Sequence, residues 1–167
     1  MRISHVLKVA IMIRSRALFG AVTAALVGLA TAASACPDWR GQPHFGSIQL
    51  NAGFMPDPHV RNITAGGTIN LQNCGTNWGG FVTQRPDFDL YWNGSSAQLT
   101  IAIEANADAI LLISAPDGTW YYNDDYRGLN PAITFSNPQQ GLYDIWIGTY
   151  DGSRRNPGRL IITEYNW

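Results

Sequence analysis

The chain is poor in charge and almost free of lysine. Charged residues make up 14% of its 167 positions, and its single lysine, Lys8, lies near the start. From Cys36 onward, seven arginines stand against twelve aspartates and glutamates, which gives this part a formal charge of −5. An acidic surface without lysine argues against nucleic acid and anionic membranes as partners, because both attract clusters of positive charge.

Histidine and cysteine are also scarce, which limits the catalytic chemistry available. Only His44 and His59 follow position 36, and no G-x-S-x-G sequence occurs, so the residue set of a serine protease is missing. No Cys-x-x-Cys sequence accompanies the histidines, which argues against a zinc site. Asp124 and Asp125 are adjacent and would point apart in an extended chain, unlike the spaced carboxylates of a glycosidase. We therefore expect a protein that is not an enzyme.

The first 35 residues have the layout of a secretory signal peptide. Arg14 and Arg16 precede an apolar run of fifteen residues, Ala17–Thr31, and the small residues Ala33–Ala35 follow it. Fifteen apolar residues fall short of the about 20 that cross a bilayer as a helix. We expect export to the periplasm or beyond the cell, with Met1 and Met12 both open as the true start.

Cleavage after Ala35 would leave residues 36–167, which is the length of a single domain. This part holds two cysteines, Cys36 and Cys74, and an exported chain with two cysteines is expected to join them in a disulfide. The alternative is that Cys36, first after the cleavage site, carries a lipid. A lipid-attachment sequence would want Leu, Val or Ile where Ala33 stands, so we favour the disulfide.

The remainder of the chain alternates between short apolar stretches and turns. In the stretch 98–105, Leu99, Ile101 and Ile103 share one face, as in a strand with one buried side. No stretch has the apolar period of a helix of useful length. Further strands are predicted at Ala109–Ser114, Gly141–Tyr150 and Arg159–Tyr165. The pattern predicts an all-β fold, an antiparallel β-sandwich with jelly-roll character.

The order of motifs within 86–164 resembles a known family. The motifs are PDFDLYW (86–92), ADAILLISAPDGTW (107–120), NDD (123–125), NPAITF (130–135) and GLYDIWIGTY (141–150). This order is similar to that of the bacterial pre-peptidase C-terminal (PPC) domain and of small secreted bacterial proteins with the same motifs. The resemblance implies an exported β-sandwich that is usually non-catalytic. Tyr122 stands where many small relatives have a cysteine, which is a departure from the pattern.

The resemblance also implies a calcium site, because some relatives carry calcium in an acidic cluster. Asp87 and Asp89 correspond to the D-x-D of the family, and Asn123, Asp124 and Asp125 to its acidic turn. Calcium takes six to eight oxygen ligands, and these side chains supply oxygens. In the alternative interpretation they only hydrogen-bond nearby backbone and stabilise turns. Both interpretations stay open from the sequence.

Aromatic residues suggest a ligand. Trp120, Tyr122 and Trp146 lie in strands where alternation would leave one set facing outward, and we expect the face of Trp146 to be half exposed. Exposed aromatic rings would stack on sugars, although large aromatics also fill the cores of small sandwiches. We expect a binding or accessory module for an unknown protein or glycan ligand, with a carbohydrate-binding module as one alternative. A protease inhibitor that uses the loops 56–61 and 152–158 is another.

Overall fold

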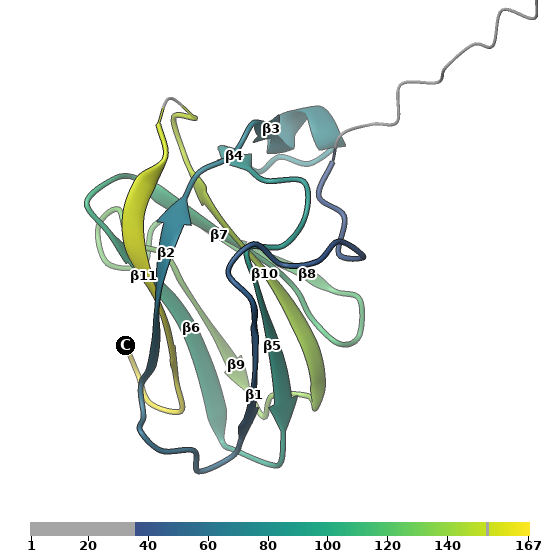
Figure 1. Cartoon of the computed structure of the whole chain (residues 1–167), viewed down its shortest axis with the longest axis vertical. Coiled ribbons are helices and arrows are strands. Elements are labelled where there is room, and N and C mark those ends of the chain that lie inside the picture. The colour runs from purple at the N-terminus through teal and green to yellow at the C-terminus, as the bar shows by residue number, and fades with distance from the viewer. Residues whose placement is uncertain (1–35, 153) are drawn as a thin grey trace, which may run out of the picture. The chain divides into compact units, whose positions relative to one another are not determined.

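The computed structural model describes residues 36–152 and 154–167, and the predicted signal peptide lies outside the described residues. The described part contains eleven strands and one short 3₁₀ helix (Figure 1). In chain order they are β1 (Ser47–Asn51), β2 (His59–Ala65), β3 (Ile69–Asn70), η1 (Leu71–Cys74), β4 (Phe81–Val82), β5 (Phe88–Asn93), β6 (Gln98–Ala105), β7 (Ala109–Ser114), β8 (Trp120–Asn123), β9 (Ala132–Ser136), β10 (Gly141–Thr149) and β11 (Asn156–Thr163). Within these ranges no helix is long and apolar enough to cross a membrane.

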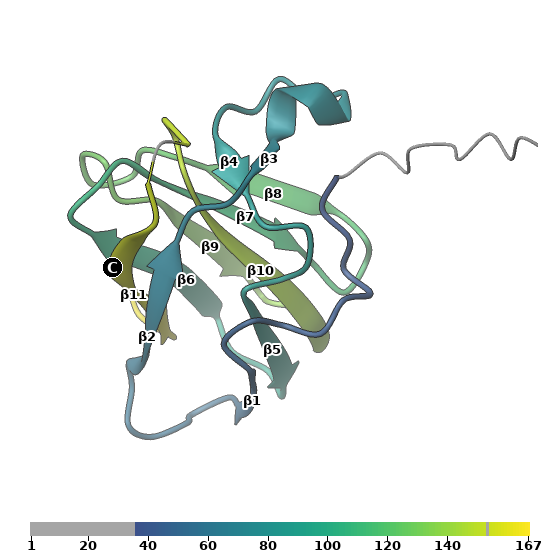
Figure 2. The ribbon, with the colours of Figure 1, turned by 45° about the horizontal axis from the view of Figure 1, so that its top comes forward.

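The strands form two sheets that pack face to face (Figures 1 and 2). The four-stranded sheet has the order β2-β11-β6-β9. In the seven-stranded sheet β10 is central, with β7 and then β8 along one edge. Along its other edge β10 pairs first with β5, which pairs with β1, and at Thr149 with β4, which pairs with β3. All pairings are antiparallel except that of β1 with β5. The prediction of an all-β antiparallel sandwich is confirmed.

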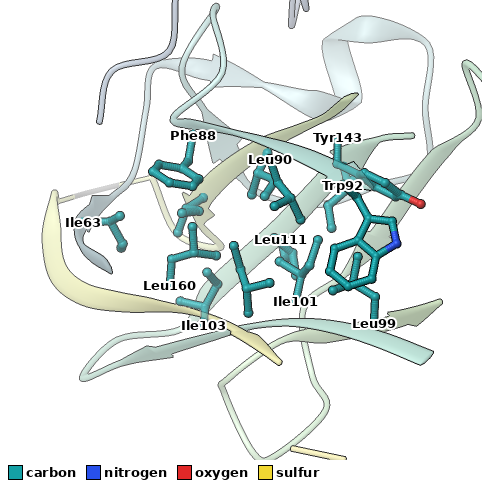
Figure 3. Close-up of a cluster of buried hydrophobic side chains, with 14 of the residues drawn as sticks. Ile63, Phe88, Leu90, Trp92, Leu99, Ile101, Ile103, Leu111, Tyr143 and Leu160 are labelled. Atoms are coloured by element: carbon teal, nitrogen blue, oxygen red, sulfur yellow. The ribbon is translucent and has the colours of Figure 1, made fainter. Parts of the chain in front are cut away.

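The core lies between the sheets and follows from the alternation seen in the sequence. Leu99, Ile101 and Ile103 of β6 are fully buried and belong to the same cluster as Leu90 of β5 and Leu111 of β7 (Figure 3). Removing such a side chain from water contributes about 1.5–3 kcal/mol. The period-two pattern therefore places one face of each strand inward and fixes the sandwich.

The outward side of the seven-stranded sheet is also covered. A second buried cluster joins Leu71 of η1 and Val82 of β4 to Ile110, Leu112 and Trp146 on the sheet. The segment β3-η1-β4 thus packs on this side, at the edge where Figure 2 shows it. This cover explains why β7 is apolar on both faces and why all six of its residues are buried.

The predicted disulfide is present. Cys36 and Cys74 are bonded, with their Cα atoms 5.7 Å apart and a sequence separation of 38 residues. The bond ties the segment that precedes β1 to η1. Because η1 packs on the outward side of the seven-stranded sheet, the disulfide holds the start of the described chain over the same side.

Candidate functional site

One row of side chains crosses five neighbouring strands of the seven-stranded sheet. In order from β1 to β8 its members are Ser47, Asp89, Asp144, Ser114 and Trp120, each directly opposite the next. Residues opposite one another on paired strands share a face of the sheet. Since Phe88 and Leu90, on either side of Asp89, belong to the core, the row lies on the outward side. We call these five residues the polar row.

The two carboxyl groups of the polar row are buried. Asp89 is 7% exposed and Asp144 is 4% exposed. Burial and, after it, the neighbouring negative charge of Asp89 raise the pKa of Asp144 to about 7. Burial also raises the pKa of Asp89 to about 6, whereas a hydrogen bond with Asp144 opposes this rise. Two carboxylates in contact cannot both ionise easily, so the pair shares one proton near neutral pH and keeps one negative charge.

This hydrogen bond does not satisfy the pair. The Oδ1 atoms of Asp89 and Asp144 are both buried without a hydrogen-bond partner. Buried polar atoms in folded proteins are nearly always paired, so an orphaned carboxylate oxygen requires an explanation. Among the described residues, the salt bridge lies on the other sheet, between Arg159 and Glu104. It does not supply a cation to the Asp89–Asp144 pair.

A hollow of about 440 Å³ opens beside Asp144. Its walls include Trp39 and Trp120, and its polar lining includes Ser114, Gln140 and Asp144. Hollows of about 300–1,000 Å³ with aromatic walls and a few polar groups are typical of small-molecule sites. We call it the tryptophan hollow.

Local turn chemistry places Trp120 in this wall. Between β7 and β8 the chain reverses over Ala115–Thr119, where Asp117 Oδ1 accepts from the Thr119 amide and Gly118 has a left-handed φ of 79°. Gly141, at the start of β10, lies against the same turn. A Cβ there would come within 2.8 Å of Pro116 Cβ, and its φ of 138° suits glycine alone. The close approach brings Trp120 and the 140–142 segment together.

Another part of the wall comes from the segment before β1. Trp39 is 51% exposed, and the Arg40 guanidinium lies over its ring at 5.2 Å from the centroid. The Asp38 amide donates to the Gln84 carbonyl at 2.6 Å, and the disulfide of Cys36 fixes the chain two residues earlier. The position of Trp39 therefore depends on the disulfide and on contacts with residues far along the sequence.

The three aromatic residues predicted as ligand contacts have different positions. Trp120 is partly buried and lines the tryptophan hollow, with its ring 5.1 Å from that of Trp146. Trp146 is fully buried, so the expectation of a half-exposed face is wrong, because the β3-η1-β4 segment covers it. Tyr122 stacks on Trp78 and its hydroxyl donates to the Gly79 carbonyl. Of the three, Trp120 lines the hollow, and the buried Trp146 ring packs against it.

The five predicted calcium ligands are not gathered around one point. Asp87 and Asp89 lie at the start of β5, whereas Asn123, Asp124 and Asp125 lie at the end of β8. The strands β10 and β7 run between β5 and β8, so three strand spacings, about 14 Å, separate the two groups. A calcium ion contacts its oxygens at about 2.3–2.6 Å. Among the described residues, no group of three or more His, Cys, Asp or Glu side chains is arranged to hold a metal.

Several of these side chains instead bond to nearby groups of the fold. Asp87 is 1% exposed, and its Oδ2 accepts from the Ile147 amide at 2.8 Å. Burial raises the pKa of Asp87 to about 7. Asn123 Oδ1 accepts from the Ala132 amide at 3.0 Å, and Asp124 accepts from the Tyr122 hydroxyl. This is the pattern expected if the residues stabilise the backbone.

The two loops proposed for protease inhibition lie at opposite ends of one strand pair. Residues 59–61 of the first belong to β2, and residues 156–158 of the second belong to β11. In that pair His59 lies opposite Ile162, and Ala65 lies opposite Asn156. Six strand residues, about 20 Å, therefore separate the loops, so each would contact a different part of a partner.

A larger hollow, of about 760 Å³, lies on the four-stranded sheet. Its charged groups already have partners: Glu104 pairs with Arg159, and Arg127 lies 5.1 Å from the ring centroid of Trp167. The tryptophan hollow differs because its carboxyl group retains an unpartnered oxygen. We therefore take the tryptophan hollow as the candidate site.

Sequence reasoning missed Trp39 and Asp144. The alternation of 141–150 does put Asp144 on the face opposite Tyr143, Ile145 and Ile147. However, no local signal shows that this face is covered or that Asp89 lies across from it. Trp39 sits in a segment without regular structure, so its partners follow only from the three-dimensional fold.

No protein-family model matches the chain, and no curated protein matches it. The structure is similar to the pre-peptidase C-terminal domain of a collagenase from Bacillus anthracis, with a TM-score of 0.42 and 12% identity over 74% of this chain and 99% of that one. It is also similar to PliG from Aeromonas hydrophila, a periplasmic inhibitor of g-type lysozyme, with a TM-score of 0.37 and 14% identity over 71% and 96%. The first is a domain of the kind that the order of sequence motifs resembles.

Proposed function

We propose that the protein is an exported, non-catalytic binding module whose ligand site is the tryptophan hollow. The observation that carries this proposal is that Trp39 and Trp120, 81 positions apart in the sequence, line one hollow together with Ser114, Gln140 and Asp144. Aromatic walls with a few convergent polar groups are the usual construction of a site for a small molecule or for one unit of a polymer.

A saccharide fits this lining best. Aromatic faces stack on the apolar faces of sugar rings, and hydroxyl, amide and carboxyl groups bind the sugar hydroxyls. Trp39 is half exposed, which leaves its ring accessible from solvent. Ser114, Gln140 and Asp144 offer oxygens within the same hollow. We therefore infer that the carbohydrate-binding alternative is the form that the binding function takes.

The geometry of the acids supports binding without hydrolysis. A glycosidase holds its two carboxyl groups about 5–9.5 Å apart so that the scissile bond fits between them. Asp89 and Asp144 instead lie opposite each other on neighbouring strands and share a hydrogen bond. A sugar bond cannot enter between two groups in direct contact, and the pair is better suited to hold a ligand.

The disulfide supports export. Disulfides form and persist in oxidising compartments such as the periplasm and the outside of the cell. Cys36 and Cys74 are joined, and the bond helps to position Trp39. The disulfide therefore supports two parts of the proposal, which are export and the position of Trp39 in the wall of the hollow.

Retention of the processed protein, residues 36–167, on insoluble polysaccharides tests the proposal. Cellulose, chitin and peptidoglycan would be compared, with the bound fraction measured after washing. We expect retention on at least one of them, and a loss of about two- to tenfold in affinity for Trp39→Ala and Trp120→Ala, because aromatic stacking contributes about 0.5–1.5 kcal/mol per ring.

Tyr165→Ala is the matched control, since Tyr165 is 68% exposed and does not line the hollow. Its retention should equal that of the wild type. Trp39→Ala is the more informative variant, because Trp120 also packs on Trp146 and its loss could disturb the fold. Equal retention of the Trp39→Ala variant and the wild type, or no retention of the wild type on any polymer, would overturn the proposal.

A further inference from the structure

The buried Asp89–Asp144 pair at the tryptophan hollow indicates the charge of the ligand. Asp144 lines the hollow, is 4% exposed, and has a buried Oδ1 without a hydrogen-bond partner. Its neighbour Asp89, behind it on β5, has the same deficiency. A negative charge in such surroundings is stabilised when a hydrogen-bonding cation reaches it.

The described chain does not bring that cation itself. Across the sheet the pair faces Ser47 on β1 and Ser114 on β7, neither of which is charged. Trp39 comes from the segment above the sheet, and the Arg40 guanidinium lies over its ring. No lysine follows position 36, and no arginine or histidine lines the hollow.

Resting on the proposed function, we propose that the tryptophan hollow binds a sugar carrying a free primary ammonium, such as a glucosamine unit of a de-N-acetylated glycan. The ammonium lies against Asp144, with Asp89 behind it. The sugar ring lies between Trp39 and Trp120. Ser114 and Gln140 provide the further acceptors that the three N–H groups of an ammonium require.

The surroundings favour an ammonium over a metal ion. Calcium needs six to eight oxygens, and the pair supplies only two carboxyl groups. Aromatic faces, by contrast, attract an organic cation directly, and most strongly where water is displaced. A sugar ring between Trp39 and Trp120 whose ammonium donates to a buried carboxylate uses both the aromatic and the acidic lining of the hollow. A neutral N-acetylated sugar would leave the unpartnered oxygen without a cation.

The test compares two probes of equal length at pH 6.5, a tetramer of glucosamine and a tetramer of N-acetylglucosamine. Affinities would be measured by isothermal titration calorimetry with the processed protein. We expect the glucosamine tetramer to bind at least about tenfold more tightly, the scale of one charge-assisted hydrogen bond. Asp144→Asn should abolish this preference, so that both tetramers bind with similar affinity.

Asp144→Asn should fold, because it removes a buried ionisable group and keeps the shape of the side chain; thermal unfolding would confirm this. Asp125→Asn is the matched control, since it removes an exposed carboxylate that lies beyond the end of β8 and does not line the hollow. It should keep the preference for glucosamine, because Asp125 does not touch the pair. A preference lost equally in both variants would show general charge attraction and would overturn the inference.

The outcomes separate the two proposals. If the N-acetylated tetramer or cellulose binds as well as the glucosamine tetramer and the binding depends on Trp39, the binding module stands and the ammonium inference fails. If no saccharide binds at all, the proposed function fails as well. A lysine-rich peptide that binds through Asp144 in place of the glucosamine tetramer would overturn the assignment to a glycan.

Discussion

Asp89 of β5 lies directly opposite Asp144 of β10, and the Oδ1 atom of each is buried without a partner. The two acids stand on the outward side of the seven-stranded sheet, at the edge of the tryptophan hollow. Their position makes the stability of the protein depend on pH in an unusual direction.

We expect the protein to become less stable as the pH rises from about 4.5 to 7.5. Burial raises the pKa of Asp144 to about 7 and that of Asp89 to about 6, whereas both lie near 3.8 in the unfolded chain. The folded state thus binds protons more tightly, and its stabilisation is complete below pH 4 and is lost as the pH rises through the folded pKa values. Thermal unfolding across this range measures the trend.

Asp144→Asn should reduce this slope and stabilise the protein at pH 7.5 by about 1–3 kcal/mol, because a buried charge no longer has to form. Some slope should remain, since burial also raises the pKa of Asp87 to about 7. His44 and His59 act in the opposite direction, because burial lowers their pKa values and they favour the folded state above pH 6.5. Their contribution cancels in the difference between variant and wild type. Parallel curves for the two proteins would contradict the prediction.

Removal of the disulfide should loosen both the fold and the site. In the chain-entropy model, a cross-link across 38 residues is worth about 3–4 kcal/mol. The free energy of unfolding of the Cys36→Ser/Cys74→Ser variant should be lower by this amount, and its unfolding midpoint should shift to a lower denaturant concentration. It should also bind polysaccharide more weakly, because Trp39 would lose its anchor. A variant that loses stability but keeps full retention would show that the segment before β1 is held by its other contacts.

Calcium binding stays a prediction, now restricted to the acidic turn. The pKa of Asp108 is raised by burial and then by the nearby charges of Asp125 and Asp124, so these acids repel one another. We expect millimolar calcium to raise the melting temperature by relieving this repulsion, and Asp125→Asn to weaken the effect. Asp117→Asn is the control. The absence of both heat in a calcium titration and a change in melting temperature would end the calcium hypothesis.

Gly148 should not tolerate a side chain. A Cβ at this position of β10 would overlap the Phe81 carbonyl oxygen and come within 2.6 Å of Ile110 Cγ1. We expect Gly148→Ala to destabilise the protein by about 1–3 kcal/mol through this overlap, as measured by denaturant unfolding. Ser136→Ala, at an exposed strand end, is the control and should change stability by less than about 0.5 kcal/mol. An unchanged midpoint for Gly148→Ala would mean that β4 moves away freely.

The sequence by itself determined the class of fold and the covalent cross-link. Leu99, Ile101 and Ile103 are buried as their spacing predicts, because alternation along a strand is a local property of the extended backbone. The pairing of Cys36 with Cys74 followed because the expected mature part contains two cysteines.

Only the tertiary structure decided the site. Asp89 and Asp144 are 55 positions apart, and their register is set by packing between the sheets. Trp146 is buried because β3, η1 and β4 cover a face that alternation alone would leave open. The same strand order keeps Asp89 away from Asp125. Local patterns state which way a side chain points from its own strand, whereas strand order and covering segments decide what it meets there.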